Sequence, residues 1–227
     1  MLLIENIETW GWEAAIRGCR NPKNSWHLSD SYWQALVPKP VKPSDFKYIL
    51  GPNDLRLTSQ LDQAGTEHRK FLRDIHVQFD VIAPMFWWAE FDTYKIATTR
   101  NSCSKMHKIH VKPFELSDFS HEGCDDVEYA SQCLAATIAT CEQLRQDFNA
   151  TGERRYWRAL IELLPEGFNM RATWDGSMET VLNILKQRDN HKLREEWGPI
   201  CSKLLVEVPY LNHYYDILKG RKDWRDE

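Results

Sequence analysis

The stretch Leu163 to Arg188, LLPEGFNMRATWDGSMETVLNILKQR, decides the fold. Pro165 ends a preceding helix, residues 168–174 predict a strand, and residues 176–187 predict a helix directly after it. A strand followed at once by a helix is a building unit of proteins that mix both kinds of element. The stretch therefore predicts a sheet with helices packed against it.

A second strand and helix lie upstream in the same order. Apolar side chains from Ile75 to Ala83 alternate with polar ones, which predicts a strand over residues 75–83 with one face on the core. Pro84 then begins a short aromatic helix, MFWWAEF. Together the two pairs predict an α/β or α+β fold around one sheet.

The remaining segments are mostly helical. Further helices are expected over residues 13–17, 53–64, 154–164 and 193–206, after a first strand over residues 2–9. The longest helix is predicted over residues 125–149, with Asp125 and Asp126 in its first turn. Residues 20–52 are rich in proline and lack periodicity, so they are predicted to be loop. With 227 residues, one domain over residues 1–227 is expected.

Composition limits the classes of partner. The net charge of −4 gives no electrostatic case for duplex nucleic acid, although small anions remain possible ligands. Ten tryptophans and nine phenylalanines suit either the stacking of flat rings or a bulky core. The six cysteines form no CxxC pair and are interpreted as reduced thiols. The N-terminus resembles no signal peptide and no apolar run suits a membrane span, so a cytoplasmic protein that binds no membrane is expected.

Three segments contain side chains that could bind a ligand or take part in a reaction. Residues 67–70 place charges at the expected mouth of the second strand, where they could meet a phosphate or form a solvated loop. Glu90 and Tyr94 share a helix face if the aromatic helix continues that far; a surface helix end is the plainer alternative. Small donors that could wrap a phosphate follow, namely Asn101, Ser102, Ser104 and Lys105.

Standard ligand motifs are missing from the sequence. Neither a GxxxxGK[ST] loop nor a GxGxxG fingerprint is present. An HxxH and an HxxC occur at His107, His110, His121 and Cys124, but no second CxxC anchors them, so no metal site is expected.

The order of the elements in the C-terminal half resembles that of the flavin-dependent thymidylate synthases, in which a strand leads to a flavin-contacting helix. The deciding stretch is followed by DNHKLREEW, with a histidine and a glutamate in the family's order. Glu67 and His68 look like the family's Glu-His-x-x-Phe strand. WWAEFD and NSCSKMH fall where the family has Arg-His-Arg and Asn-x-x-Ser-x-Arg-Tyr. The resemblance covers residues 52–210 and, weakly, residues 2–18, and it implies a central antiparallel sheet flanked by helices.

The resemblance also implies ligands and site residues. His68, Asn183, Arg188 and His191 would lie near FAD, and Ser104 would lie near the nucleotide. Glu90 and Asp92 stand at the flavin-binding Arg-His-Arg position, which reverses the local charge. Other family arginines are replaced at Ile161, Glu179 and Trp197, and Lys105 and Met106 stand in place of the family's Gly-Arg pair. Each lost contact to a phosphate costs about 1.5 to 3 kcal/mol.

Two functions follow from this resemblance. The first is a FAD-dependent methyl or hydroxymethyl transferase acting on a pyrimidine nucleotide such as dUMP, in a phage or mobile element, with NADPH and methylenetetrahydrofolate as further ligands. The second is a non-catalytic nucleotide-binding or interaction protein that keeps the fold. Either would be a homo-oligomer, a tetramer by resemblance.

Overall fold

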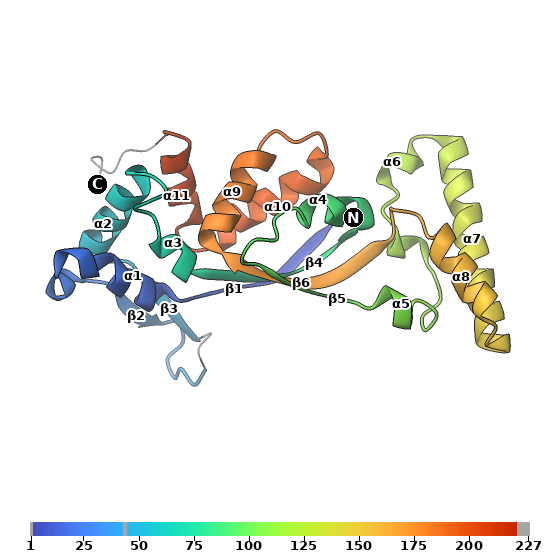
Figure 1. Cartoon of the computed structure of the whole chain (residues 1–227), viewed down its shortest axis with the longest axis horizontal. Coiled ribbons are helices and arrows are strands. Elements are labelled where there is room, and N and C mark those ends of the chain that lie inside the picture. Colours follow the sequence, from blue (N-terminus) through green and yellow to red (C-terminus); the bar gives the residue numbers. More distant parts are fainter. Residues whose placement is uncertain (1, 43–44, 222–227) are drawn as a thin grey trace. The chain divides into compact units, whose positions relative to one another are not determined.

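A central four-stranded sheet organises the chain (Figure 1). The computed structural model describes residues 2–42 and 45–221. Strands β1 (Leu3–Trp10), β4 (His76–Pro84), β6 (Asn169–Ser177) and β5 (Thr99–Ser102) lie side by side in that order. The sheet is antiparallel, so the expected α+β class with a central antiparallel sheet and flanking helices is confirmed.

The chain divides into two compact units, which are described separately. Unit 1 comprises residues 1–6, 79–174 and 193–200. Unit 2 comprises residues 7–78, 175–192 and 201–227. In the part of the chain that the structure describes, no helix is long and apolar enough to cross a membrane.

Aromatic side chains fill the core of unit 1. Helix α4 (Met85–Phe91) packs Trp87 and Phe91 with ring centroids 4.6 Å apart, and Trp197 of α10 (Arg194–Glu207) lies 5.0 Å from Trp87. Phe79 and Trp174 on the sheet are 5.0 Å apart and add a second aromatic layer. Many of the aromatic residues therefore fill the core, which is one of the two roles that the sequence suggested for them.

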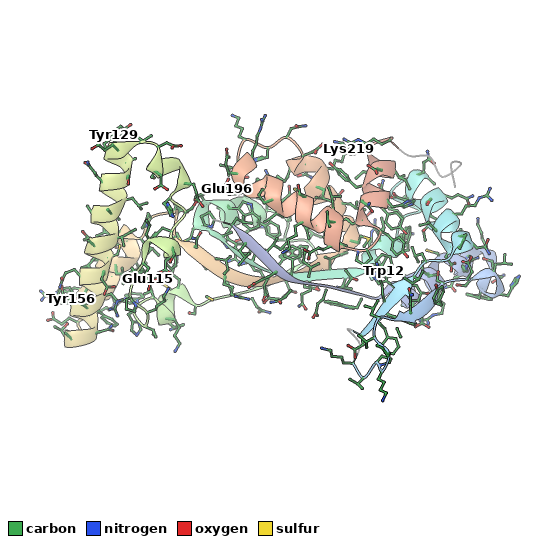
Figure 2. All side chains as sticks on the ribbon, turned by 180° about the vertical axis from the view of Figure 1, so that it is seen from behind. Trp12, Glu115, Tyr129, Tyr156, Glu196 and Lys219 are labelled. Carbon is green, nitrogen blue, oxygen red and sulfur yellow. The ribbon has the colours of Figure 1, made fainter. Side chains whose placement is uncertain are left out.

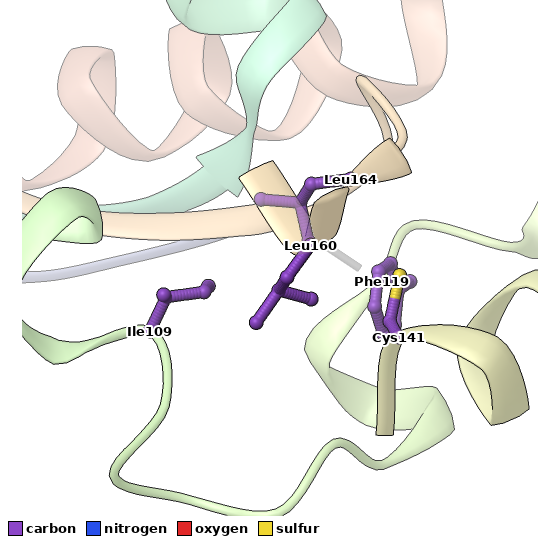
Figure 3. Packing of buried hydrophobic residues seen from close by; sticks show 5 residues of the cluster. All are labelled: Ile109, Phe119, Cys141, Leu160 and Leu164. Atoms are coloured by element: carbon purple, nitrogen blue, oxygen red, sulfur yellow. The ribbon is translucent and has the colours of Figure 1, made fainter. Parts of the chain in front are cut away.

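A separate core holds the helical hairpin of unit 1 together. Helix α7 (Glu128–Thr151) packs against α8 (Arg154–Leu163), after the short helices α5 (Lys105–Lys108) and α6 (Glu122–Asp125). Figure 3 shows its five buried residues, which come from α7, α8 and the adjoining loops: Ile109, Phe119, Cys141, Leu160 and Leu164.

A carboxylate ties three strands of unit 1 together on the half-exposed face of the sheet. Asp80 of β4 accepts hydrogen bonds from Thr173 Oγ1 (2.5 Å), Asn6 Nδ2 (2.9 Å) and Arg171 (2.9 Å). These bonds, that of Thr173 foremost, lower the pKa of Asp80 to about 2. The network is structural, because each carboxylate oxygen already has a protein donor.

Unit 2 surrounds helix α9 (Met178–Arg188). It contains α1 (Trp12–Arg20), α2 (Pro52–Gln63), α3 (Phe71–Asp74) and α11 (Leu211–Leu218). Strands β2 (Tyr32–Ala35) and β3 (Phe46–Ile49) form an antiparallel hairpin with Tyr32 opposite Ile49. Asp54 is fully buried at the start of α2 and binds Arg20 at 2.6 Å, Ser29 and Ser31. This network fastens the segment before the hairpin to α2.

Three sequence-based predictions need correction. The segment of residues 20–52 is only partly loop, because it forms the β2–β3 hairpin. Asp125 and Asp126 do not begin the long helix, since α6 ends at Asp125 and α7 begins at Glu128. Residues 67–70 do not open directly into the strand, because the turn of α3 intervenes before His76.

Candidate functional site

The predicted phosphate-binding donors lie together in unit 1, where β5 leads into α5. Asn101 and Ser102 end β5 with exposed side chains. Ser104 caps α5, and its hydroxyl accepts a hydrogen bond from the backbone N–H of His107 at 3.3 Å. Lys105 Nζ lies 3.1 Å from Met85 Sδ, so α5 is tied to the start of α4.

The acidic pair Glu90 and Asp92 lies at the end of α4, also in unit 1. The helix ends at Phe91 and does not continue to Tyr94, so the condition under which Glu90 and Tyr94 would share a helix face is not met. Asp92 pairs with Arg100 at 2.6 Å, and the Arg100 guanidinium lies 4.8 Å from the centroid of the Trp88 ring. The expected reversal of the local charge is therefore only partial, because the cation of Arg100 lies beside Asp92.

The histidine of the predicted flavin site lies in a turn of unit 2. His68 is exposed, and its backbone N–H donates to the Gly65 carbonyl at 2.9 Å. The neighbouring Arg69 lies 3.5 Å from Asp62, whose side chain is 1% exposed. Burial raises the pKa of Asp62 to about 6, opposed by Arg69 and assisted by Glu179.

Helix α9 carries two more of the predicted residues, Asn183 and Arg188, and His191 follows it in unit 2. Glu179 pairs with Arg73 of α3, with Nε and Oε2 2.5 Å apart. Asn183 follows one turn later and is exposed. Arg188 is the last residue of the helix, about 13 Å from Glu179 along its axis, and is half-buried. His191 lies beyond the helix and is also half-buried. The exposed side of α9 is thus polar along its length.

The structure sorts the ten predicted site residues into two sets. Unit 2 holds His68, Asn183, Arg188 and His191, and unit 1 holds Glu90, Asp92, Asn101, Ser102, Ser104 and Lys105. All ten are exposed or half-buried, so a ligand can reach each set. Sequence reasoning missed Arg73 and Arg100, although Arg73 follows residues 67–70 closely and Arg100 directly precedes Asn101.

Solved structures show what the chain is similar to. Thymidylate synthase X from Helicobacter pylori, crystallised with FAD and dUMP, matches 96% of this chain and 98% of its own, with a TM-score of 0.66 and 14% identity. A second structure, the flavin-dependent thymidylate synthase ThyX from Helicobacter pylori complexed with FAD and dUMP, matches 94% and 96%, with a TM-score of 0.62 and 14% identity. No family model and no curated protein matches the sequence.

The chain has the fold of the flavin-dependent thymidylate synthases. At 14% identity the likeness shows the fold alone. Within this thymidylate synthase fold, two acids stand where the family resemblance expects arginine, and each binds an arginine from another segment. Asp92 binds Arg100, and Glu179 binds Arg73. Each of these acids is therefore paired with a cation within its own unit.

Proposed function

We propose that the protein is a FAD-dependent methyl or hydroxymethyl transferase acting on a pyrimidine nucleotide similar to dUMP. One observation carries the proposal: the fold matches nearly the whole of a protein crystallised with FAD and dUMP. The residues that the resemblance assigns to the ligands are accessible in both units. NADPH and methylenetetrahydrofolate belong to the proposal as further ligands, as does a cytoplasmic location.

The residues of this chain can bind a flavin nucleotide through uncharged hydrogen-bonding side chains and through arginines. When bound, FAD would supply hydride transfer. His68, Asn183 and His191 offer hydrogen-bonding groups for a ring or a ribose, and Arg188 offers a guanidinium. Ser104 and its neighbours would hold the nucleotide.

Besides Arg188, which the family pattern keeps, two further arginines can supply phosphate contacts. Arg73 has a side chain 47% exposed, and Arg100 is 27% exposed. A guanidinium carries five N–H donors in a planar fork and can bind a phosphate while keeping one bond to a carboxylate. We expect affinity for FAD and dUMP to depend on both arginines.

The first test is whether the purified protein binds FAD. We expect yellow flavin absorbance, or a rise in melting temperature with FAD that grows when dUMP is added, because each ligand stabilises the folded state it binds. A transfer assay with dUMP, NADPH and methylenetetrahydrofolate then measures turnover. Colourless protein with no melting shift at millimolar FAD would contradict the proposal.

A matched pair of variants tests the assigned position on α9. Asn183→Ala should weaken FAD binding about tenfold, because one hydrogen bond to the ligand is lost. Asn190→Ala, at an exposed asparagine just beyond the same helix, should leave FAD affinity unchanged. Equal affinities for the two variants would remove Asn183 from the site.

The paired acids favour a second candidate function, a nucleotide binder without catalysis. Asp92 and Glu179 occupy part of the hydrogen-bonding capacity of Arg100 and Arg73. A protein of this kind would show a melting shift with a nucleotide but no flavin absorbance and no turnover. The same binding and transfer assays separate the two functions.

A further inference from the structure

An aromatic groove lies in unit 2, between β1, the β2–β3 hairpin and the end of α10. Its volume is about 580 Å³. Grooves for small ligands span roughly 300 to 1000 Å³ and are lined by aromatic side chains with a few polar groups. In Figures 1 and 2 the hairpin lies below β1, whereas α3 and α9 lie above it. The groove is therefore separate from the polar face of α9.

The ring faces of the groove are held in fixed positions. Trp12, which is labelled in Figure 2, and Tyr48 are both buried in unit 2. Trp33 lies 5.0 Å from Tyr48, and its indole N–H donates to Glu13 at 3.2 Å. Both contacts fix the orientation of an indole that is 50% exposed. A fixed, exposed indole suits stacking by a flat ring, because little side-chain entropy is lost on binding.

Trp10 is braced in the same way on β1. It is 41% exposed and stacks on His76, with centroids 5.3 Å apart and planes 6° apart. His76 in turn pairs with Asp175 at 3.2 Å. The groove thus has two exposed indoles, each held by contacts with its own unit.

Both positively and negatively charged side chains line the groove. Lys42 and Lys47 come from the hairpin, and Glu8 and Glu207 come from β1 and the end of α10. Ammonium groups bind a phosphate, and carboxylates accept hydrogen bonds from the N–H edge of a heterocycle. A ligand that joins a flat N–H-bearing ring to an anionic group can make all of these contacts. Its ring stacks on the indoles, its N–H groups donate to the carboxylates, and its anionic group binds the lysines.

We propose that this groove binds a mononucleotide, with the base on the indoles and the phosphate at the lysines. The site uses none of the residues assigned to FAD or dUMP above, so it stands or falls independently of the proposed function. It gives the protein a nucleotide site in addition to the one proposed above.

The probe is guanosine monophosphate, whose base presents adjacent N–H donors and whose tail is a phosphate. Tryptophan fluorescence of the whole protein should be quenched in a saturable way, with a Kd of about 1 mM or lower. Trp33→Leu should weaken binding about tenfold, because stacking on one aromatic ring contributes about 1 to 3 kcal/mol. Guanosine, which lacks the phosphate, should bind the unchanged protein more weakly than the nucleotide.

Two charge variants separate binding in the groove from binding elsewhere. Lys47→Glu should remove the preference for the nucleotide over guanosine, whereas Lys23→Glu, at an exposed lysine outside the groove, should preserve it. Trp26→Leu, at an indole 50% exposed outside the groove, controls for the loss of a tryptophan. Binding that is absent, or equal in the groove and control variants, overturns the proposal. FAD binding should be the same in all four variants, so failure here is distinct from failure of the proposed function.

Discussion

At the scale of the residue, Asp62 predicts a dependence of stability on pH. Its folded pKa of about 6 lies above the ordinary value of 3.8, so the folded state binds the proton more tightly than the unfolded state. The stabilising contribution is complete below pH 4 and is lost as pH rises through 6. Its size is about 2 to 3 kcal/mol. Asp62→Asn should therefore gain stability relative to the unchanged protein between pH 4 and pH 8, as measured by urea unfolding.

The exposed Asp126 provides the control for this effect. Asp126→Asn should change the free energy of unfolding by less than about 0.5 kcal/mol at either pH. The free energy of unfolding of Asp62→Asn is compared with that of the unchanged protein from pH 4 to pH 8. If the difference stays constant over this range, Asp62 does not titrate as proposed.

The pairing of charges is also a residue-scale property that sequence reasoning did not reach. The acids at positions 92 and 179 were noticed as departures from the family pattern, but their partners were not. Glu179 lies 106 residues from Arg73, so only the packing of α3 against α9 brings them together. Arg100 is close in sequence, but its contact with Asp92 depends on α4 ending at Phe91.

At the scale of the element, Gly11 predicts a strict requirement at the junction of β1 and α1. Its φ is +88°, and a Cβ built there would overlap the carbonyl oxygen of Asp74. Gly11→Ala should therefore cost at least about 2 kcal/mol, since backbone strain and a clash with backbone add together. Gly152 has a φ of +68° at the end of α7, with open space around it. Gly152→Ala should cost only about 1 kcal/mol by urea unfolding, and equal costs would contradict this account.

Elements with strong periodicity were predicted well, and elements made by pairing were not. The alternation from Ile75 to Ala83 gave β4, and the apolar spacing gave α7 and α8 to within a few residues. Strands β2, β3 and β5 have four residues each, too few for a pattern to be distinguished from loop. Their hydrogen-bonded partners define them, and partners are not visible in a single sequence. Helix α11 was missed as well.

At the scale of the whole molecule, the resemblance predicted the fold, whereas the residues alone gave only its class. Periodicity supported one sheet with helices, and the order of degenerate motifs from residue 52 to residue 210 supplied the topology that the solved structures bear out. The predicted site residues stay predictions, because they lie in two units and their roles depend on ligands. Oligomerisation stays a prediction for the same reason.

The expected tetramer gives the last prediction. Sedimentation should give a mass about four times the 26.8 kDa of one chain. Helix α7 exposes Tyr129 (79%), Ala136 and Thr140 at helical spacing, and Figure 2 shows Tyr129 at the start of the helix. If this face packs on another copy, Ala136→Arg should reduce the mass, because a long charged side chain cannot fit a close helix contact. Because Ala136 is exposed, helix content should not change. Thr66→Arg, in an exposed turn, should keep the tetramer, and a tetramer that survives Ala136→Arg would place the subunit contact elsewhere.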